Sequence, residues 1–192
     1  GEISADLEVD LPYDLKVYAN YSLSRPDARI PKTSIFSIFT DGKYQSFGGE
    51  LGYFSEGLLS ARLGGRYLVF DGGGSGYELK FKPVISSGRV DADMAGIEVG
   101  RLKEDDNGYT SLRFFGSYRI EKLTATLDAN NYFYDEKVSG YSRSHIVTLT
   151  FGYDIFENAL IQGDIVATVN PEFDQEWAGL LKFNYFFNSF AR

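Results

Sequence analysis

Residues 59–70 read Leu-Ser-Ala-Arg-Leu-Gly-Gly-Arg-Tyr-Leu-Val-Phe, and this stretch decides the fold class. Its odd positions hold apolar side chains or glycine, whereas Ser60, Arg62 and Arg66 occupy even positions. A period of two is that of a β-strand, because successive side chains point to opposite faces of a sheet. The segment is therefore predicted to be a strand with one apolar face and one charged face.

The same alternation recurs along the whole chain, in segments separated by turn-forming residues. It is regular over residues 3–11, 15–23, 59–69, 77–82, 111–120, 123–130, 147–154, 161–169 and 177–187. It is less regular over residues 35–40, 44–54 and 90–101, the last of which changes phase as a β-bulge near Ala95 and Gly96 would make it do. A meander of such strands satisfies its two edges by closing on itself. We therefore predict one all-β domain over residues 1–192, a closed antiparallel up-and-down β-barrel of about 12 strands.

The composition excludes several classes of protein. With 19 Lys and Arg against 27 Asp and Glu, the net charge is −8 and the pI is near 4.7. This argues against nucleic-acid binding, which needs a cationic surface. The absence of Cys excludes disulfides, thiolate metal sites and cysteine nucleophiles, and a single His excludes a multi-histidine metal site. We expect no bound metal or cofactor.

Strand length and aromatic placement indicate that the apolar face contacts lipid. The segments are about ten residues long, which matches a tilted membrane-spanning strand and exceeds the five or six residues, roughly, that are usual in soluble sheets. Aromatic residues also cluster at the segment ends, where membrane barrels have aromatic girdles. They are Tyr44, Phe54, Phe70, Tyr77, Tyr109, Tyr132, Phe133, Tyr134, Tyr153, Phe156, Phe173, Trp177, Phe186 and Phe187.

The last segment ends in aromatic residues at alternate positions, Phe183, Tyr185 and Phe187. In this the chain resembles the bacterial outer-membrane β-barrel superfamily of porin-like small barrels, whose last strand typically ends in an aromatic assembly signal. The resemblance covers the whole chain and is architectural. Residues 188–192 depart from the pattern by running past the terminal aromatic residue. The resemblance implies a transmembrane barrel in the bacterial outer membrane, with outer-membrane lipid as a partner. A soluble β-barrel or sandwich is the alternative.

An even number of strands would place both ends of the barrel chain on the periplasmic side. The connections expected to face outward are then residues 11–14, 40–43, 71–76, 103–108, 134–143 and 170–176. Residues 25–34 would form a periplasmic loop.

The polar positions of the strands supply the candidate functional residues, which would line the lumen. The predicted pore-lining cations are Lys16, Arg62, Arg66, Lys80, Lys82, Arg113, Arg119 and Lys182. The predicted pore-lining anions are Asp6, Glu8, Asp10, Glu50, Glu78, Asp91, Asp93, Glu98, Asp128, Asp154 and Asp164. Cations dominate residues 59–82 and 111–120, and anions dominate the first segment and residues 123–169. Closure would therefore oppose a basic and an acidic wall across the lumen and create a transverse field.

This arrangement predicts a channel for small hydrophilic solutes without enzymatic chemistry. Two alternatives stay open at this point. The charges can pair across strands and fill the interior. The chain can also be a non-conducting structural barrel that anchors or docks a protein partner in the membrane.

His145 is the only histidine available for the Ser/His chemistry of a lipid-modifying enzyme, and it follows Ser142 and Ser144. Ser144 and His145 are adjacent, so they should point to opposite faces of a strand. We therefore interpret His145 as an interfacial histidine without a catalytic role.

Two loop motifs have simple interpretations. Residues 104–108, Glu-Asp-Asp-Asn-Gly, lack the full calcium-loop pattern and are interpreted as a solvated turn. Residues 71–76, Asp-Gly-Gly-Gly-Ser-Gly, open no helix and lack the Gly-Lys-Ser/Thr ending of a phosphate loop. We interpret them as a flexible hairpin loop.

Overall fold

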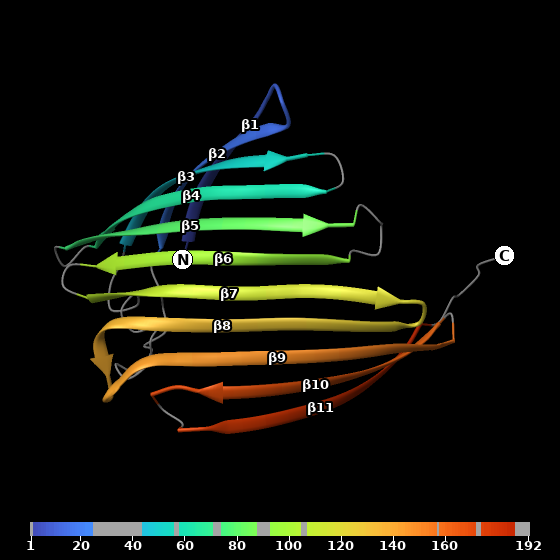
Figure 1. Ribbon diagram of the computed structural model, residues 1–192. Coiled ribbons are helices and arrows are strands. Elements are labelled where there is room, and N and C mark those ends of the chain that lie inside the picture. The colour runs from blue at the N-terminus through green and yellow to red at the C-terminus, as the bar shows by residue number, and fades with distance from the viewer. Residues whose placement is uncertain are drawn as a thin grey trace.

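The computed structural model describes residues 2–24, 44–55, 58–70, 74–87, 93–104, 107–156, 158–171 and 174–186. These residues form one antiparallel sheet of eleven strands, in which each strand pairs with the next along the chain (Figure 1). Within these ranges, no helix has the length and apolar character needed to cross a membrane. The predicted all-β, up-and-down antiparallel meander is thus confirmed.

The described strands are β1 (Glu2–Leu11), β2 (Leu15–Ser24), β3 (Tyr44–Phe54), β4 (Leu59–Phe70), β5 (Ser75–Ser86), β6 (Met94–Glu104), β7 (Asn107–Ile120), β8 (Leu123–Val138), β9 (Tyr141–Phe156), β10 (Ala159–Val169) and β11 (Glu176–Tyr185). Nine of them have 10–14 residues, near the predicted ten, but β8 and β9 have 16 residues each, so the prediction that residues 134–143 form a long connection is wrong. No pairing joins β1 to β11 in the described sheet, so its two edges are not closed against each other.

The connection between β2 and β3 changes the predicted topology. The strand expected over residues 35–40 lies outside the described residues, and β2 and β3 pair directly, from Leu15 opposite Tyr53 to Ser24 opposite Tyr44. The described sheet therefore has an odd number of strands. As a result, β1 begins at one end of the sheet and β11 finishes at the other. The prediction that an even count brings both to one side is wrong for this sheet.

We call the end where β1 begins the N-terminal end and the end where β11 finishes the C-terminal end. The connections 71–74, 105–106, 139–140 and 170–175 follow strands that finish at the N-terminal end. The turn 12–14 lies at the C-terminal end. The prediction that residues 11–14 share a side with the other outward connections is therefore wrong, because it counted a strand between β2 and β3.

The predicted bulge near Ala95 and Gly96 is also wrong. The register of β6 is constant against β5, where Met94 faces Ser86, and against β7, where Met94 faces Ser117. The apparent change of phase came from Asp91, which lies outside the described residues, and from Asp93, which precedes the strand and so does not share its alternation. Register shifts occur instead between Phe133 and Val138 and between Ala159 and Leu160.

The sheet has one apolar face and one polar face, as the alternation requires. We define the apolar face by the odd positions of β1–β6 and β8–β11 and the even positions of β7, which the registers align. Large apolar side chains on this face are exposed, with Leu63 57% and Leu181 73% accessible. The buried apolar side chains in the described part of the chain are few: Leu68, Leu102, Tyr134 and Ala159. Figure 1 shows a strongly curled sheet, with β1 and β2 turned behind β5 and β6.

Replacing Gly76 with Ala is expected to destabilise the sheet by about 1–3 kcal/mol, because the new methyl group must displace backbone. A Cβ atom at Gly76 would lie 2.6 Å from the carbonyl oxygen of Lys103 on the paired strand. Gly163→Ala is the matched control, since a Cβ atom there meets nothing within 4 Å. Equilibrium unfolding in urea measures both variants, and equal unfolding midpoints would contradict the β5–β6 register.

Candidate functional site

The predicted pore-lining residues that the structure describes within strands all lie on the polar face. The registers set Asp10 opposite Lys16 and Arg66 opposite Glu78. Asp91 lies outside the described residues, and Asp93 precedes β6, where its carboxylate accepts a hydrogen bond from the backbone N–H of Arg119 at 2.8 Å. The polar face is therefore the candidate functional site.

Each of the eight predicted cations lies beside a carboxylate of the same face. The N–O distances are 2.8 and 3.0 Å for Lys16 to Glu8 and Asp10, 3.6 Å for Arg62 to Glu50, 2.5 Å for Arg66 to Glu78, 2.8 Å for Lys80 to Glu78, 3.9 Å for Lys82 to Glu98, 2.6 Å for Arg119 to Asp154 and 2.7 Å for Lys182 to Asp164, and Arg113 pairs with Asp128. The charges are thus largely paired locally. Pairing across strands was the alternative to two opposed walls that the sequence left open.

The most enclosed of these pairs surrounds Glu78, whose residue is only 8% exposed. Its two oxygens contact Arg66 and Lys80 from different positions, so one carboxylate serves two cations. Beside them lies a recess of about 220 Å³, which we call the Glu78 recess; Gly64 lies in its lining, together with Glu50. Because glycine has no side chain, this position leaves space between the charged groups of β3, β4 and β5.

A second recess, of about 680 Å³, lies over β1 to β4, and we call it the acidic recess. Its charged lining consists of Asp6, Glu8, Glu50 and Arg62. Anions exceed cations here, whereas β4 and β5 carry four of the eight cations. A weak charge gradient across the polar face therefore remains after local pairing.

A network of uncharged partners fixes the carboxylates of β8 and β10. Asp164 accepts hydrogen bonds from Thr150 at 2.8 Å and Gln162 at 2.9 Å, in addition to its contact with Lys182. Asp128 likewise accepts from Asn130 at 2.7 Å. The neutral members were not predicted from the sequence, although they occupy polar-face positions of the same alternation as the charged ones.

Aromatic rings also contact the charges. The ring of Phe115 lies under both Lys82, at 4.9 Å, and Arg113, at 5.0 Å. A cation held over a ring face gains a modest attraction and loses side-chain freedom. The cations of this region are consequently held in place by rings and carboxylates together.

His145 lies on the apolar face, away from its neighbouring serine. Its Nδ1 atom is 2.7 Å from Oδ1 of Asn131 on β8. Ser144 lies on the polar face, 1% exposed, with its hydroxyl 2.7 Å from that of Tyr134. The expectation that Ser144 and His145 point to opposite faces is confirmed, so this adjacent pair does not assemble a Ser/His site.

The loop motifs offer little chemistry within the described residues. Asp105, Asp106 and residues 71–73 lie outside them. Asn107 accepts a hydrogen bond from the N–H of Gly108 at 2.8 Å, which is a local turn contact. In the ranges that the structure describes, no group of three or more His, Cys, Asp or Glu residues could hold a metal ion.

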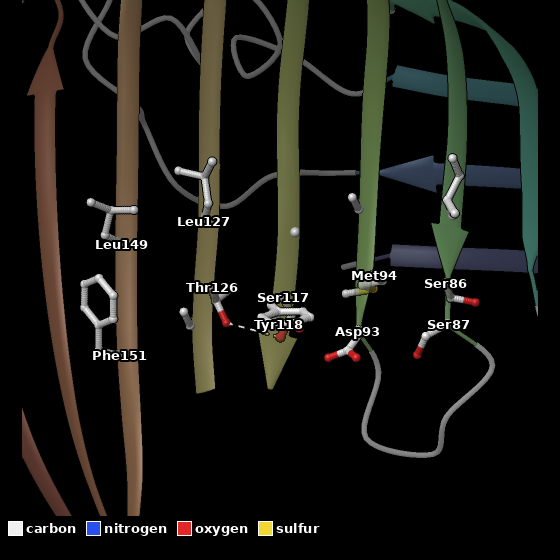
Figure 2. Close-up of a pocket in the computed structure, with 14 residues that line it drawn as sticks. Ser86, Ser87, Asp93, Met94, Ser117, Tyr118, Thr126, Leu127, Leu149 and Phe151 are labelled. Carbon is white, nitrogen blue, oxygen red and sulfur yellow. Dashed lines mark hydrogen bonds between the residues drawn. The ribbon is translucent and has the colours of Figure 1, made fainter. Parts of the chain in front are cut away.

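A third recess, of about 570 Å³, opens near the C-terminal end of the sheet over β5–β9 (Figure 2). Leu127, Leu149 and Phe151 lie along one side of it on β8 and β9. Its floor is formed by Ala95 and Gly116, which face each other in the register and whose small size leaves the space open. It is an apolar indentation in a surface that is already apolar.

Replacing Glu78 with Gln is expected to destabilise the fold by about 1–3 kcal/mol, because it leaves Arg66 and Lys80 close together without their shared counter-charge. Asp6→Asn is the control, since Asp6 is exposed and makes no ion pair within the described residues. Urea unfolding compares the two variants. Equal losses, or none at Glu78, would contradict the pairing.

No protein-family model, curated protein or solved structure matches this chain.

Proposed function

We propose that this chain is a transmembrane β-barrel of the bacterial outer membrane whose polar face lines a narrow lumen for small hydrophilic solutes. The observation that supports the proposal is the exposure of large apolar side chains on one face of the described sheet. They come from every strand, with Leu7, Leu63 and Phe183 each more than half accessible. In water such a surface would be far larger than the apolar patches that soluble monomers expose.

Lipid accounts for this face more simply than a protein cover does. A membrane barrel presents apolar and aromatic side chains outward and polar side chains inward, alternating along each strand. The recess beside Leu127 and Phe151 would then hold part of a lipid chain, because apolar side chains make up most of its lining; Asp93 lies at its rim.

Closure of the sheet belongs to the same proposal. The edges of β1 and β11 leave backbone N–H and C=O groups without a strand partner in the described sheet. Such groups cost several kcal/mol each, roughly, in hydrocarbon, so a membrane-embedded sheet must close or be completed. If the sheet closes, we expect its polar face to line the interior.

The local pairing of charges predicts the kind of pore. Two opposed walls would give a strong transverse field and strong ion selectivity. In this sheet Glu78 partly compensates Arg66 and Lys80, and Asp128 neutralises Arg113, so only a weak gradient remains. We therefore propose a weakly selective pore.

A specific observation favours a second candidate, a non-conducting structural barrel that docks a protein partner. Several buried side chains gather on the polar face toward the N-terminal end of the sheet, including Ser46, Leu68, Leu102, Tyr134 and Ser144. Packing at that end would narrow or block a lumen.

Bilayer recording separates the two candidates. The purified protein is expected to give discrete conductance steps with weak ion selectivity. The double variant Arg62→Gln, Lys80→Gln should shift the permeability several-fold toward cations, because it removes two cations and leaves Glu50 and Glu78 in place.

The control is Lys122→Gln, which removes a cation from an exposed turn outside the polar face. A correctly folded protein that stays silent in the bilayer would reject the channel and support the docking barrel. A conducting double variant with unchanged selectivity would reject the assignment of these residues to the lumen.

A further inference from the structure

The apolar face holds one cluster of charges, at the N-terminal end of the sheet. Arg101 of β6 donates from both terminal nitrogens to the two carboxylate oxygens of Asp135 on β8, each at 2.6 Å. Lys103 lies 3.4 Å from the same carboxylate. Arg101 and Lys103 share the alternation of Ile97 and Val99, which are exposed on the apolar face.

A glycine makes this cluster possible, because β7 lies between β6 and β8. Gly108 of β7 pairs with Lys103. A Cβ atom at Gly108 would lie 3.1 Å from an oxygen of Asp135 and 2.4 Å from the carbonyl oxygen of Leu102. The missing side chain lets Asp135 reach across β7 and hold both cations in fixed positions.

A third cation extends the cluster along the same end of the sheet. Arg143 of β9 is exposed, and it faces Phe133 of β8 in the register, on the apolar face. We call Arg101, Lys103, Asp135 and Arg143 the basic rim. Its three cations exceed its one carboxylate, so the rim is positively charged.

The distribution of charge makes the basic rim distinctive. At the odd positions of the described strands that define the apolar face, and the even ones of β7, Lys and Arg occur at Arg101, Lys103 and Arg143 and, beyond the register shift of β8, at Lys137, all toward the N-terminal end. Figure 1 shows the place, where the arrows of β6 and β8 end. The cations therefore mark one edge of the apolar surface and are missing from its opposite edge within the described strands.

We propose that the basic rim binds the phosphate of an anionic membrane lipid. The inference rests on the proposed membrane location, because it needs the apolar face beside the rim to contact hydrocarbon. Lys and Arg at that boundary attract anionic headgroups, and a guanidinium held in a fixed plane suits phosphate oxygens. The exposed rings of Tyr77 and Phe133, on the same face, lie next to the rim where interfacial aromatic residues belong.

Asp135 has a defined part in this proposal. It occupies one edge of the Arg101 guanidinium and draws the Lys103 ammonium toward it, so both cations are positioned before a lipid arrives. Preorganisation of this kind reduces the ordering cost of binding. One carboxylate against three cations leaves the rim with an excess of positive charge for the phosphate.

Lipid retention measured by native mass spectrometry tests the proposal. The protein, first reconstituted in vesicles, is extracted with detergent and titrated with phosphatidylglycerol or phosphatidylcholine. The native chain is expected to retain phosphatidylglycerol preferentially. The triple variant Arg101→Gln, Lys103→Gln, Asp135→Asn, which leaves no unpaired carboxylate, should lose roughly tenfold or more of that preference.

The matched control is Lys16→Gln, Arg62→Gln, Asp10→Asn, which makes the same change of charge on the polar face. It should keep the preference for phosphatidylglycerol. Equal retention of both lipids by the native chain, or equal loss in both triple variants, overturns the proposal. Glycerol phosphate serves as a soluble probe, and competition by it as strong as that by the lipid would identify a free-phosphate site and overturn the lipid assignment.

Protease protection in the same vesicles separates this result from the proposed function. Inserted, protected protein without headgroup preference overturns the lipid site alone. Failure of the folded native chain to insert overturns both the membrane barrel and the lipid site.

Discussion

The constraint on which the rest of the structure depends is the register between neighbouring strands. Side chains alternate with a period of two, so a slip of one residue in any ladder would move a whole set of charges to the apolar face. Where Arg66 lies opposite Glu78, the register both forms an ion pair and keeps the two surfaces of the sheet separate. Folding and the chemistry of the polar face are therefore specified by the same hydrogen-bond ladders.

Much of this could be predicted, because alternation is a local property of the sequence. Residues 59–70 indicate a strand and its charged face without any knowledge of their neighbours. Partnership is not local: nothing in the spacing of Arg113 and Asp128 states that their strands are adjacent, and nothing in residues 25–43 states that β2 pairs with β3. The strand count, the sidedness of the turn 12–14 and the pairing of the charges therefore required the structure.

Arg101 and Lys103 illustrate a second limit. The alternation of residues 90–101 was interpreted through Asp93, which lies outside the strand, and this hid the fact that Arg101 belongs with Ile97 and Val99. Only a glycine opposite Lys103 and a carboxylate from β8 make their position on the apolar face favourable. The sequence around such a charge does not reveal its partner when the counter-ion comes from a different strand. Its position on an apolar face is therefore explained only by the structure.

The described sheet has an odd number of strands, which would have a consequence at any seam between β1 and β11. Ten antiparallel ladders leave β1 and β11 running in the same direction, so a direct junction between them would be parallel. Hydrogen bonds in a parallel ladder are slanted, and the pairing is slightly less stable per residue than in an antiparallel one. A barrel closed in this way would have one weaker strand pairing, between β1 and β11. Amide hydrogens of β1 and β11 would then exchange with solvent faster than those in the middle strands.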